Sequence, residues 1–253
     1  MRRMDRTATD VLTRVLPSPS AVARSLCAIA HRKGPDLRAP RYSPETLPGF
    51  IVVEGLDGAG TSTQSELLRK RLRREGYNAE LSAEPTNGPV GTLVRQIMRG
   101  RLNISADRLV TERQLAYLFA ADRHDHLYND VDGIAGLSAR GIVAISTRYF
   151  FSSYAYNGRT MQAFDLVERL NADFPLPQAV VYLRVPVEVS LARLNKRDVR
   201  EFYEHEDELR RVDAAFGSLF GAIRDRVVEV ESVGDATEVS DRIAEGVLAI
   251  LRK

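Results

Sequence analysis

The run from Phe50 to Leu68, FIVVEGLDGAGTSTQSELL, has the residue types and spacing of a phosphate-binding loop. Its glycines let the chain turn tightly and bring backbone amides close to an anion, and the helix that follows points its first N–H groups at the same place. The spacing fits G-x-x-x-x-G-K-[ST], with Gly55 and Gly60 as the two glycines. The residues expected to bind phosphate are Gly55, Gly58, Ala59, Gly60, Thr61, Ser62 and Thr63.

One position departs from this motif, because Thr61 stands where the motif has lysine. In phosphoryl transfer that lysine reaches the β- and γ-phosphate oxygens, and the next hydroxyl is a ligand of Mg²⁺. Ser62 keeps the hydroxyl and is the candidate Mg²⁺ ligand, whereas a threonine supplies no charge. An ordinary glycine-rich turn is the alternative. The apolar run before the loop and the helical pattern after it favour phosphate binding.

The rest of the chain supplies a sheet and helices to hold such a loop. Apolar, β-branched runs predict strands, and amphipathic runs between them predict helices. Strands are expected at 51–54, 79–82, 142–146, 179–185 and 227–231, and helices near 62–75, 89–100, 106–129, 151–171, 187–196, 204–223 and 236–251. This alternation is typical of an α/β fold in which helices flank a central five-stranded parallel sheet.

The first 46 residues differ in composition from the rest. They hold nine Lys/Arg against four Asp/Glu and five prolines, so we predict a basic N-terminal extension, 1–46, followed by one domain, 47–253. The extension could be an organellar transit peptide, although Asp5 and Asp10 count against that interpretation. The alternative is a tail that packs on the domain or stays disordered.

The bulk composition excludes several classes of protein. The chain has 253 residues, 44% of them hydrophobic and 28% charged, as in ordinary globular proteins. No apolar run approaches the roughly 20 residues of a membrane span, and no secretory signal is visible. Cys27 is the single cysteine, which excludes a disulfide framework and favours a reducing compartment, so we expect a cytoplasmic protein without a membrane partner. The formal net charge of +2 leaves the part after residue 46 at −3, which argues against nucleic-acid binding.

Five further segments follow the loop in a set order: EPTNGPVG (84–91), LFAADRHDHL (118–127), STRYFFSSYAYNG (146–158), PLPQAVVYLRVPVEVSLARL (175–194) and RLNKRDVREFYE (193–204). With the loop, they resemble the thymidylate kinase family from about residue 50 to the C-terminus. The resemblance implies a three-layer P-loop kinase that converts dTMP to dTDP with ATP and Mg²⁺. It also implies a homodimer.

The resemblance assigns an acceptor-binding set: Asp57, Phe119, Arg123, Arg148, Ser153 and Tyr156. Phe119 and Arg123 are four residues apart on one helix face, and the family uses such a pair to stack on thymine and bond its edge. A core phenylalanine and a solvated arginine are the alternative. Arg148 follows an apolar strand, at the sheet edge where α/β folds bind ligands, and corresponds to an arginine that grips the acceptor phosphate.

An arginine-rich stretch resembles the family's lid, a loop that closes on ATP. Its arginines are Arg193, Arg197 and Arg200. Because a lid arginine can stabilise the transition state, Arg197 and Arg200 are candidate catalytic residues. Asp57 and Arg148 of the acceptor-binding set are the other two candidates. A solvated basic face is the alternative for the lid arginines.

Three positions depart from the family pattern: Thr61, Thr147 and Ala83 stand where relatives carry lysine, aspartate and arginine. Loss of the lysine and the aspartate together indicates either a paired rearrangement, in which hydroxyls replace two opposite charges, or decay to nucleotide binding without transfer. The retained acceptor residues favour an active enzyme. Three hypotheses stay open: a dTMP kinase, a kinase for another or modified deoxynucleoside monophosphate, and a catalytically impaired nucleotide-binding protein.

Overall fold

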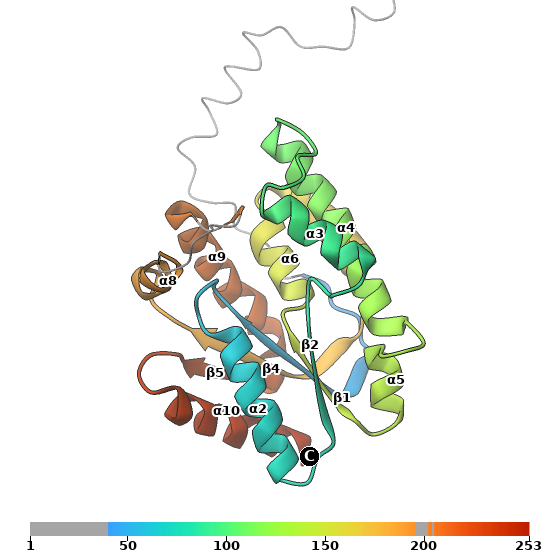
Figure 1. Cartoon of the computed structure of the whole chain (residues 1–253), viewed down its shortest axis with the longest axis vertical. Helices are drawn as coiled ribbons and strands as arrows, with labels where there is room; N and C mark the ends of the chain where they lie inside the picture. The colour runs from blue at the N-terminus through green and yellow to red at the C-terminus, as the bar shows by residue number, and fades with distance from the viewer. Residues whose placement is uncertain (1–39, 196–201, 204, 253) are drawn as a thin grey trace, which may run out of the picture. The chain divides into compact units, whose positions relative to one another are not determined.

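The computed structural model describes residues 40–195, 202–203 and 205–252. At its centre lies one sheet in the strand order β2-β3-β1-β4-β5, in which every neighbouring pair is parallel (Figure 1). The strands are β1 (Thr46–Gly55), β2 (Ala79–Ala83), β3 (Val143–Thr147), β4 (Leu176–Arg184) and β5 (Val227–Glu231). The predicted α/β fold with a five-stranded parallel sheet is confirmed.

Strand β1 occupies the middle of the sheet because both of its faces are apolar. Phe50 to Val53 have no exposed surface, which fits the continuous apolar run of a strand covered on two sides. The chain moves outward from β1 to β2, returns to β3, and then crosses to β4 on the other side of β1. Ligands of open α/β sheets bind at such a reversal, outside the carboxyl ends of the strands. The loop after β1 lies at this edge.

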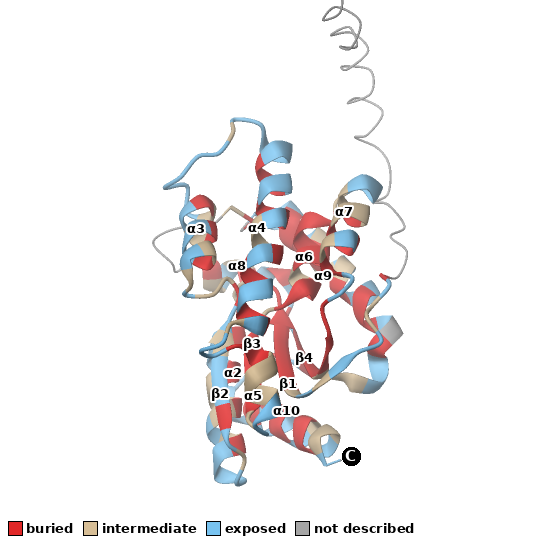
Figure 2. Cartoon of the chain, turned by 90° about the vertical axis from the view of Figure 1, so that its right-hand side faces the viewer, coloured by how far each residue is buried: buried red, intermediate tan, exposed pale blue. Residues whose placement is uncertain are grey.

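Helices cover both faces of the sheet. Helices α2 (Thr61–Arg74) and α10 (Ala236–Leu251) pack together on one face (Figure 1). The connections to β3, β4 and β5 contain the remaining helices, which are α3 (Pro89–Met98), α4 (Arg108–Tyr128), α5 (Ile134–Ala139), α6 (Phe150–Asn157), α7 (Met161–Asn171), α8 (Val187–Leu194), α9 (Glu206–Leu219) and the 3₁₀ helix η2 (Phe220–Arg226). Of these, α5 contacts β1 and β3 and η2 contacts β4 and β5 on the other face. Figure 2 shows the buried residues on the strands and on the inward sides of the helices.

Two helix predictions need correction, and one helix was not predicted. The single helix expected at 151–171 is two helices, because α6 ends at Asn157 with Gly158 as its C-cap, and Thr160 caps α7 by accepting the Ala163 N–H at 3.1 Å. The helix expected at 204–223 is α-helical only to Leu219 and continues as the 3₁₀ helix η2. The short helix α5, with the sequence IAGLSA, was not predicted, because its 6 residues are too few to show a helical period.

The described residues before β1 pack on the domain. The ring of Tyr42 lies 5.9 Å from that of Phe150 and 5.8 Å from that of Phe151, and its hydroxyl donates to the Leu219 carbonyl at 2.9 Å. Residues 1–39 lie outside the described residues, so the division at residue 46 stays a prediction. No helix in the described part of the chain is long and apolar enough to cross a membrane.

Candidate active site

The phosphate loop leaves its amides and the start of α2 open to a ligand. Gly58 and Gly60 have φ angles of 83° and 93°, in the left-handed region that favours glycine. Gly60 is the N-cap of α2, and no side chain caps that helix. The first N–H groups of α2 are therefore available for an anion, and the helix dipole favours one there. Gly55 is the last residue of β1 and lies buried beneath the loop.

Neighbouring elements hold the loop backbone in place. Arg193, at the end of α8, donates to the Gly58 carbonyl at 3.0 Å and to the Ser232 carbonyl at 3.1 Å. The Ser232 hydroxyl donates to the Ala59 carbonyl at 2.7 Å. Arg193, predicted as a lid residue, thus lies against the loop. The predicted Arg197 and Arg200 lie outside the described residues.

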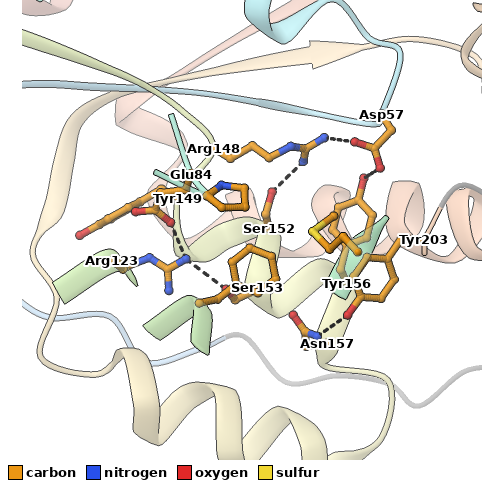
Figure 3. A pocket seen from close by; sticks show the side chains of 13 residues that line it. Asp57, Glu84, Arg123, Arg148, Tyr149, Ser152, Ser153, Tyr156, Asn157 and Tyr203 are labelled. Carbon is orange, nitrogen blue, oxygen red and sulfur yellow. Dashed lines mark hydrogen bonds and ion pairs between the residues drawn. The ribbon is translucent and has the colours of Figure 1, made fainter. Parts of the chain in front are cut away.

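Two hollows meet at this edge of the sheet. The first, called the inner pocket, is lined by the 13 residues drawn in Figure 3. All of the predicted acceptor residues line it: Asp57, Phe119, Arg123, Arg148, Ser153 and Tyr156. The second, called the loop cleft, is lined by the phosphate loop from Gly58 to Thr63 without Ala59, by Ala83, Arg95 and Thr147, and by four residues that it shares with the inner pocket. The shared residues are Asp57, Glu84, Pro85 and Arg148.

Arg148 lines both hollows, and Figure 3 shows its guanidinium bonded to Asp57 and Ser152. Its Nη2 donates to Asp57 Oδ1 at 2.5 Å, and its Nη1 lies 3.9 Å from Glu54 Oε2. Burial would lower the pKa of the guanidinium, but the charges of Asp57 and Glu54, with the Tyr156 hydroxyl, outweigh burial and raise it. Arg148 therefore presents a permanent positive charge to both hollows.

Tyr156 completes the wall beside Asp57. Its hydroxyl donates to Asp57 Oδ2 at 3.1 Å, and the guanidinium of Arg148 lies 5.4 Å from the centre of its ring. Burial, followed by the charge of Asp57, raises the pKa of the Tyr156 hydroxyl, so this side chain stays a neutral donor. Tyr156 thereby fixes the second oxygen of Asp57 and closes one side of the inner pocket.

A second buried arginine holds the opposite side of the inner pocket. Arg123 Nη2 donates to Glu84 Oε2 at 2.6 Å and to Ser153 Oγ at 3.1 Å. Its Nη1 donates to Asn171 Oδ1 at 2.5 Å. His126 lies 3.1 Å from the other oxygen of Glu84. Arg123 is thus neither solvated nor mobile, and Glu84 is the anion that permits its burial.

The remaining wall contains aromatic side chains. Phe119 is half-buried on the face of α4 that also carries Arg123. Tyr203 packs on Tyr156 with 5.3 Å between ring centres, and its hydroxyl accepts a hydrogen bond from Asn157 at 2.7 Å. The inner pocket therefore combines flat apolar walls with an arginine at each end, which suits a planar polar base joined to a phosphate.

Comparisons with known proteins show the family of this chain. The family model described as thymidylate kinase matches residues 53–243, which is more than half of the chain. A thymidylate kinase of Xanthomonas oryzae pv. oryzae is 40% identical over 180 residues, which cover 69% of this chain and 74% of the relative. The chain belongs to the thymidylate kinase family. This membership confirms the resemblance seen in the sequence.

Two further relatives cover more of the chain. A protein of Treponema pallidum, provisionally named a thymidylate kinase, is 33% identical over 203 residues, which cover 78% of this chain and 93% of the relative. A protein of Aeropyrum pernix with the same provisional name is 36% identical over 210 residues, which cover 80% and 97%. The similarity thus extends over nearly the whole length of these two relatives.

The positions that depart from the thymidylate kinase pattern lie together. Thr61, Thr147 and Ala83 all line the loop cleft. Thr147 Oγ1 donates to Ser65 Oγ of α2 at 2.9 Å, in a buried and uncharged pair. Among the described residues that line the cleft, Arg95 and Arg148 are the cations.

Several residues of the site had no predicted role: Glu84, Arg95, Ser152, Asn157 and Tyr203. Glu84 belongs to the EPTNGPVG segment and directly follows a strand. Because ligands of α/β folds bind at the carboxyl ends of strands, this position could have indicated a site residue. Arg95 is fastened by the carbonyls of Pro85 and Thr86 and by the side chain of Asn87. Because these contacts join α3 to a loop, no pattern within α3 indicates them.

Proposed function

We propose that this protein transfers the γ-phosphoryl group of Mg·ATP to dTMP, which gives ADP and dTDP. The observation that carries the proposal is that the inner pocket and the loop cleft share Asp57 and Arg148. A nucleoside monophosphate in the inner pocket, with its phosphate at Arg148, would face the phosphates of a nucleotide held by the loop. Membership of the thymidylate kinase family supports this pair of substrates.

The donor nucleotide would bind through backbone more than through side-chain charge. The loop amides and the uncapped start of α2 would hold its phosphates. Mg²⁺ fits the oxygen donors that line the loop cleft, since it takes one or two protein ligands together with phosphates and water. The exposed Ser62 hydroxyl is the proposed protein ligand, and the bound ion would neutralise phosphate charge. Arg197 and Arg200 stay proposed lid residues that would reach the transition state.

The inner pocket would select the base through Arg123 and Phe119. Within the described part of the chain, the buried Nε–H of Arg123 has no hydrogen-bond partner. A guanidinium only donates, so it favours a base edge that offers a carbonyl oxygen, as thymine does at O4, over the amino group of cytosine. Phe119 would stack on the ring. Ser153 and Tyr156 would lie near the base and the deoxyribose.

The test is ADP formation by the purified protein with Mg·ATP and dTMP, beside dUMP, dCMP and dGMP and without an acceptor. Rapid turnover with dTMP, and slow turnover with dCMP, is the expected result. Rapid turnover with a different deoxynucleotide would instead support a kinase of another acceptor. Turnover that does not depend on any acceptor would contradict the proposal.

A catalytically impaired nucleotide-binding protein is the second candidate. The neutral Thr147–Ser65 pair and the absence of a lysine at position 61 favour it, because two of the family's charges are missing from the loop cleft. Calorimetric binding of ATP and dTMP without any ADP formation would support this candidate. The complete set of acceptor residues around the inner pocket favours the active kinase.

We further propose that the protein is a homodimer. Large apolar side chains are exposed on α3, on α4 and on the chain between them: Leu93, Leu102, Ile104, Leu109, Val110 and Tyr117. A second copy would cover such a surface. Light scattering coupled to size exclusion measures the mass, and a monomer at all concentrations would contradict the dimer. A cytoplasmic location stays a prediction from the sequence.

A further inference from the structure

Glu54 is a buried carboxylate beside the candidate active site that lines neither hollow. It is the last residue but one of β1 and has no exposed surface. Its Oε1 accepts the backbone N–H groups of Tyr149 at 3.0 Å and of Ser152 at 3.2 Å. Its Oε2 accepts the Ser152 hydroxyl at 2.7 Å. All of these partners belong to the turn after β3 and the first turn of α6.

These contacts give α6 a cap that its own residues do not supply. Tyr149 is the N-cap of α6, and no side chain of the helix start makes a capping bond. In an ordinary capping box two residues share the work, since one side chain accepts the N–H at N3 and the other accepts the N–H of the N-cap. Glu54 accepts both of these N–H groups from the neighbouring strand. Strand β1 therefore fixes where α6 begins.

The residue before this cap is Arg148, which has an unusual backbone. Its φ angle is 73°, in a region that side chains other than glycine rarely adopt. Three contacts hold it there. The Arg148 N–H donates to the Val53 carbonyl at 3.0 Å, the Ser146 hydroxyl donates to the Arg148 carbonyl at 2.7 Å, and Glu54 holds the N–H of the next residue. Glu54 thus helps to maintain the turn that directs Arg148 to the hollows.

Ser152 connects Glu54 to the guanidinium itself. Because the Ser152 hydroxyl donates to Glu54, its lone pairs remain for Arg148 Nη1, which donates to it at 2.8 Å. The other end of the guanidinium donates to Asp57. The side chain of Arg148 is therefore fixed by a chain of hydrogen bonds that runs through Ser152 to the buried carboxylate.

We propose that Glu54 is a positioning residue for the acceptor phosphate: it caps α6 from β1 and, through Ser152, sets the orientation of Arg148. The proposal rests on the proposed function, in which Arg148 binds that phosphate. Burial raises the pKa of Glu54 to about 7, against the charge of Arg148 and the bonds from Ser152 and Tyr149, which lower it. Burial thus opposes the charge of Glu54 at this position. Besides the nearby Arg148, its partners are the N–H groups and the hydroxyl that it caps at the start of α6, which indicates that capping is the role of this side chain.

The test compares Glu54→Ala and Glu54→Gln with the wild type in steady-state kinetics. Glu54→Ala removes every cap acceptor and should raise the KM for dTMP about tenfold, which corresponds to one lost hydrogen bond, with the KM for ATP changed less than about twofold. Glu54→Gln keeps one oxygen for the two backbone N–H groups and should recover most of that loss. Glu229→Gln, an exposed glutamate on β5 paired with Arg184, is the matched control and should change neither KM.

Ser152→Ala separates the two parts of the proposal and also serves if Glu54→Ala does not fold. It removes the link to the guanidinium and leaves the backbone cap, so the KM for dTMP should rise about threefold at unchanged KM for ATP. Equal changes in both KM values, or an unchanged KM for dTMP in Glu54→Ala and Ser152→Ala, would overturn the proposal. Calorimetric Kd values for dTMP repeat the comparison without turnover. A failure of catalysis in the wild type is therefore distinguishable from a failure of positioning.

Discussion

Replacing Arg148 tests the charge arrangement on which the proposed transfer depends. The guanidinium donates to Asp57 at 2.5 Å and to Ser152 at 2.8 Å, and only 17% of the side chain is exposed. It is also one of the four residues shared by the inner pocket and the loop cleft. Arg148→Ala removes the one cation among the described residues that the two hollows share, and it leaves the carboxylates of Asp57 and Glu54 without that partner.

The magnitude follows from the bonds that an acceptor phosphate would lose. A hydrogen bond to a charged group contributes about 1.5–3 kcal/mol, and a guanidinium can offer two to one phosphate. Part of this free energy is offset, because Arg148 would give up its bond to Asp57 when it binds the phosphate. We therefore expect Arg148→Ala to lose about 2–4 kcal/mol, which is about 30- to 1000-fold in kcat/KM for dTMP. Arg148→Lys keeps the charge without the planar fork and should fall between Arg148→Ala and the wild type.

A second substitution at the same position separates folding from function. At a φ of 73°, alanine keeps the backbone strain and glycine relieves it, so Arg148→Gly should be more stable than Arg148→Ala by about 1 kcal/mol. Both lack the guanidinium and should have equally low kcat/KM. Urea denaturation measures the stabilities, and coupled ADP release measures the kinetics.

Two outcomes would refute the reasoning. Unchanged kcat/KM for dTMP in Arg148→Ala would mean that this arginine does not bind the acceptor. Activity that follows the stability difference, with Arg148→Gly clearly more active than Arg148→Ala, would mean that the losses come from the fold and not from the missing charge.

Four further tests address separate parts of the site and fold. Thr61→Lys alone should not raise kcat, whereas Thr61→Lys with Thr147→Asp should at least match the wild type; a large gain from Thr61→Lys alone would show that the natural site is damaged. Burial raises the pKa of Glu54 from 4.5 to about 7. Between these pH values the folded chain keeps a proton on Glu54 that the unfolded chain loses. The free energy of unfolding therefore falls as pH rises through this range. Glu54→Gln should lack this fall of roughly 3 kcal/mol in denaturation at pH 5 and pH 8; an equal pH dependence in both proteins would exclude it. Arg123→Ala leaves Glu84 buried without its cation and should cost about 3–5 kcal/mol of stability in urea denaturation, and a loss below 1 kcal/mol would contradict the burial of this pair. A Cβ at Gly158 would lie 2.5 Å from the Tyr154 carbonyl, so Gly158→Ala should lower stability by about 1–3 kcal/mol in thermal unfolding, unless α6 and α7 can merge.

The sheet could be predicted from sequence because its signals are local. The apolar run at Phe50–Val53 and the glycines after it indicate a buried strand and a loop without any knowledge of their neighbours. The break at Gly158 had a local signal that the prediction of one helix over 151–171 passed over. The polar run Asn157 to Thr160 interrupts the apolar pattern with an Asn-Gly pair, which marks turns, and ends in a threonine that caps α7. The short helix α5 has too few turns for a period to be recognised.

The site could be predicted only in part, for a different reason. Phe119, Arg123 and Arg148 came from a family resemblance, and all three line the inner pocket. The partners that hold them did not, since Glu84 is 39 positions from Arg123 and Asn171 is 48. A charge that is buried by pairing looks in sequence like a charge on the surface. The carboxylate that fixes Arg148 is hidden in the same way, inside an apolar strand.

The loop cleft shows how such pairing bears on the missing lysine. A lysine at 61 and an aspartate at 147 would add one charge of each sign, so their joint replacement by threonines leaves the net charge of the cleft unchanged. The Thr147 hydroxyl donates to the Ser65 hydroxyl, and both side chains are buried. The replacement of both charged residues by threonine therefore leaves no unpaired acid behind. Loss of the lysine alone would have left that acid facing the donor phosphates, where like charges repel. The two substitutions therefore fit a rearranged site better than random decay. Under the proposed function, phosphate binding would then depend on the backbone amides and on the two arginines that line the cleft, Arg95 and Arg148.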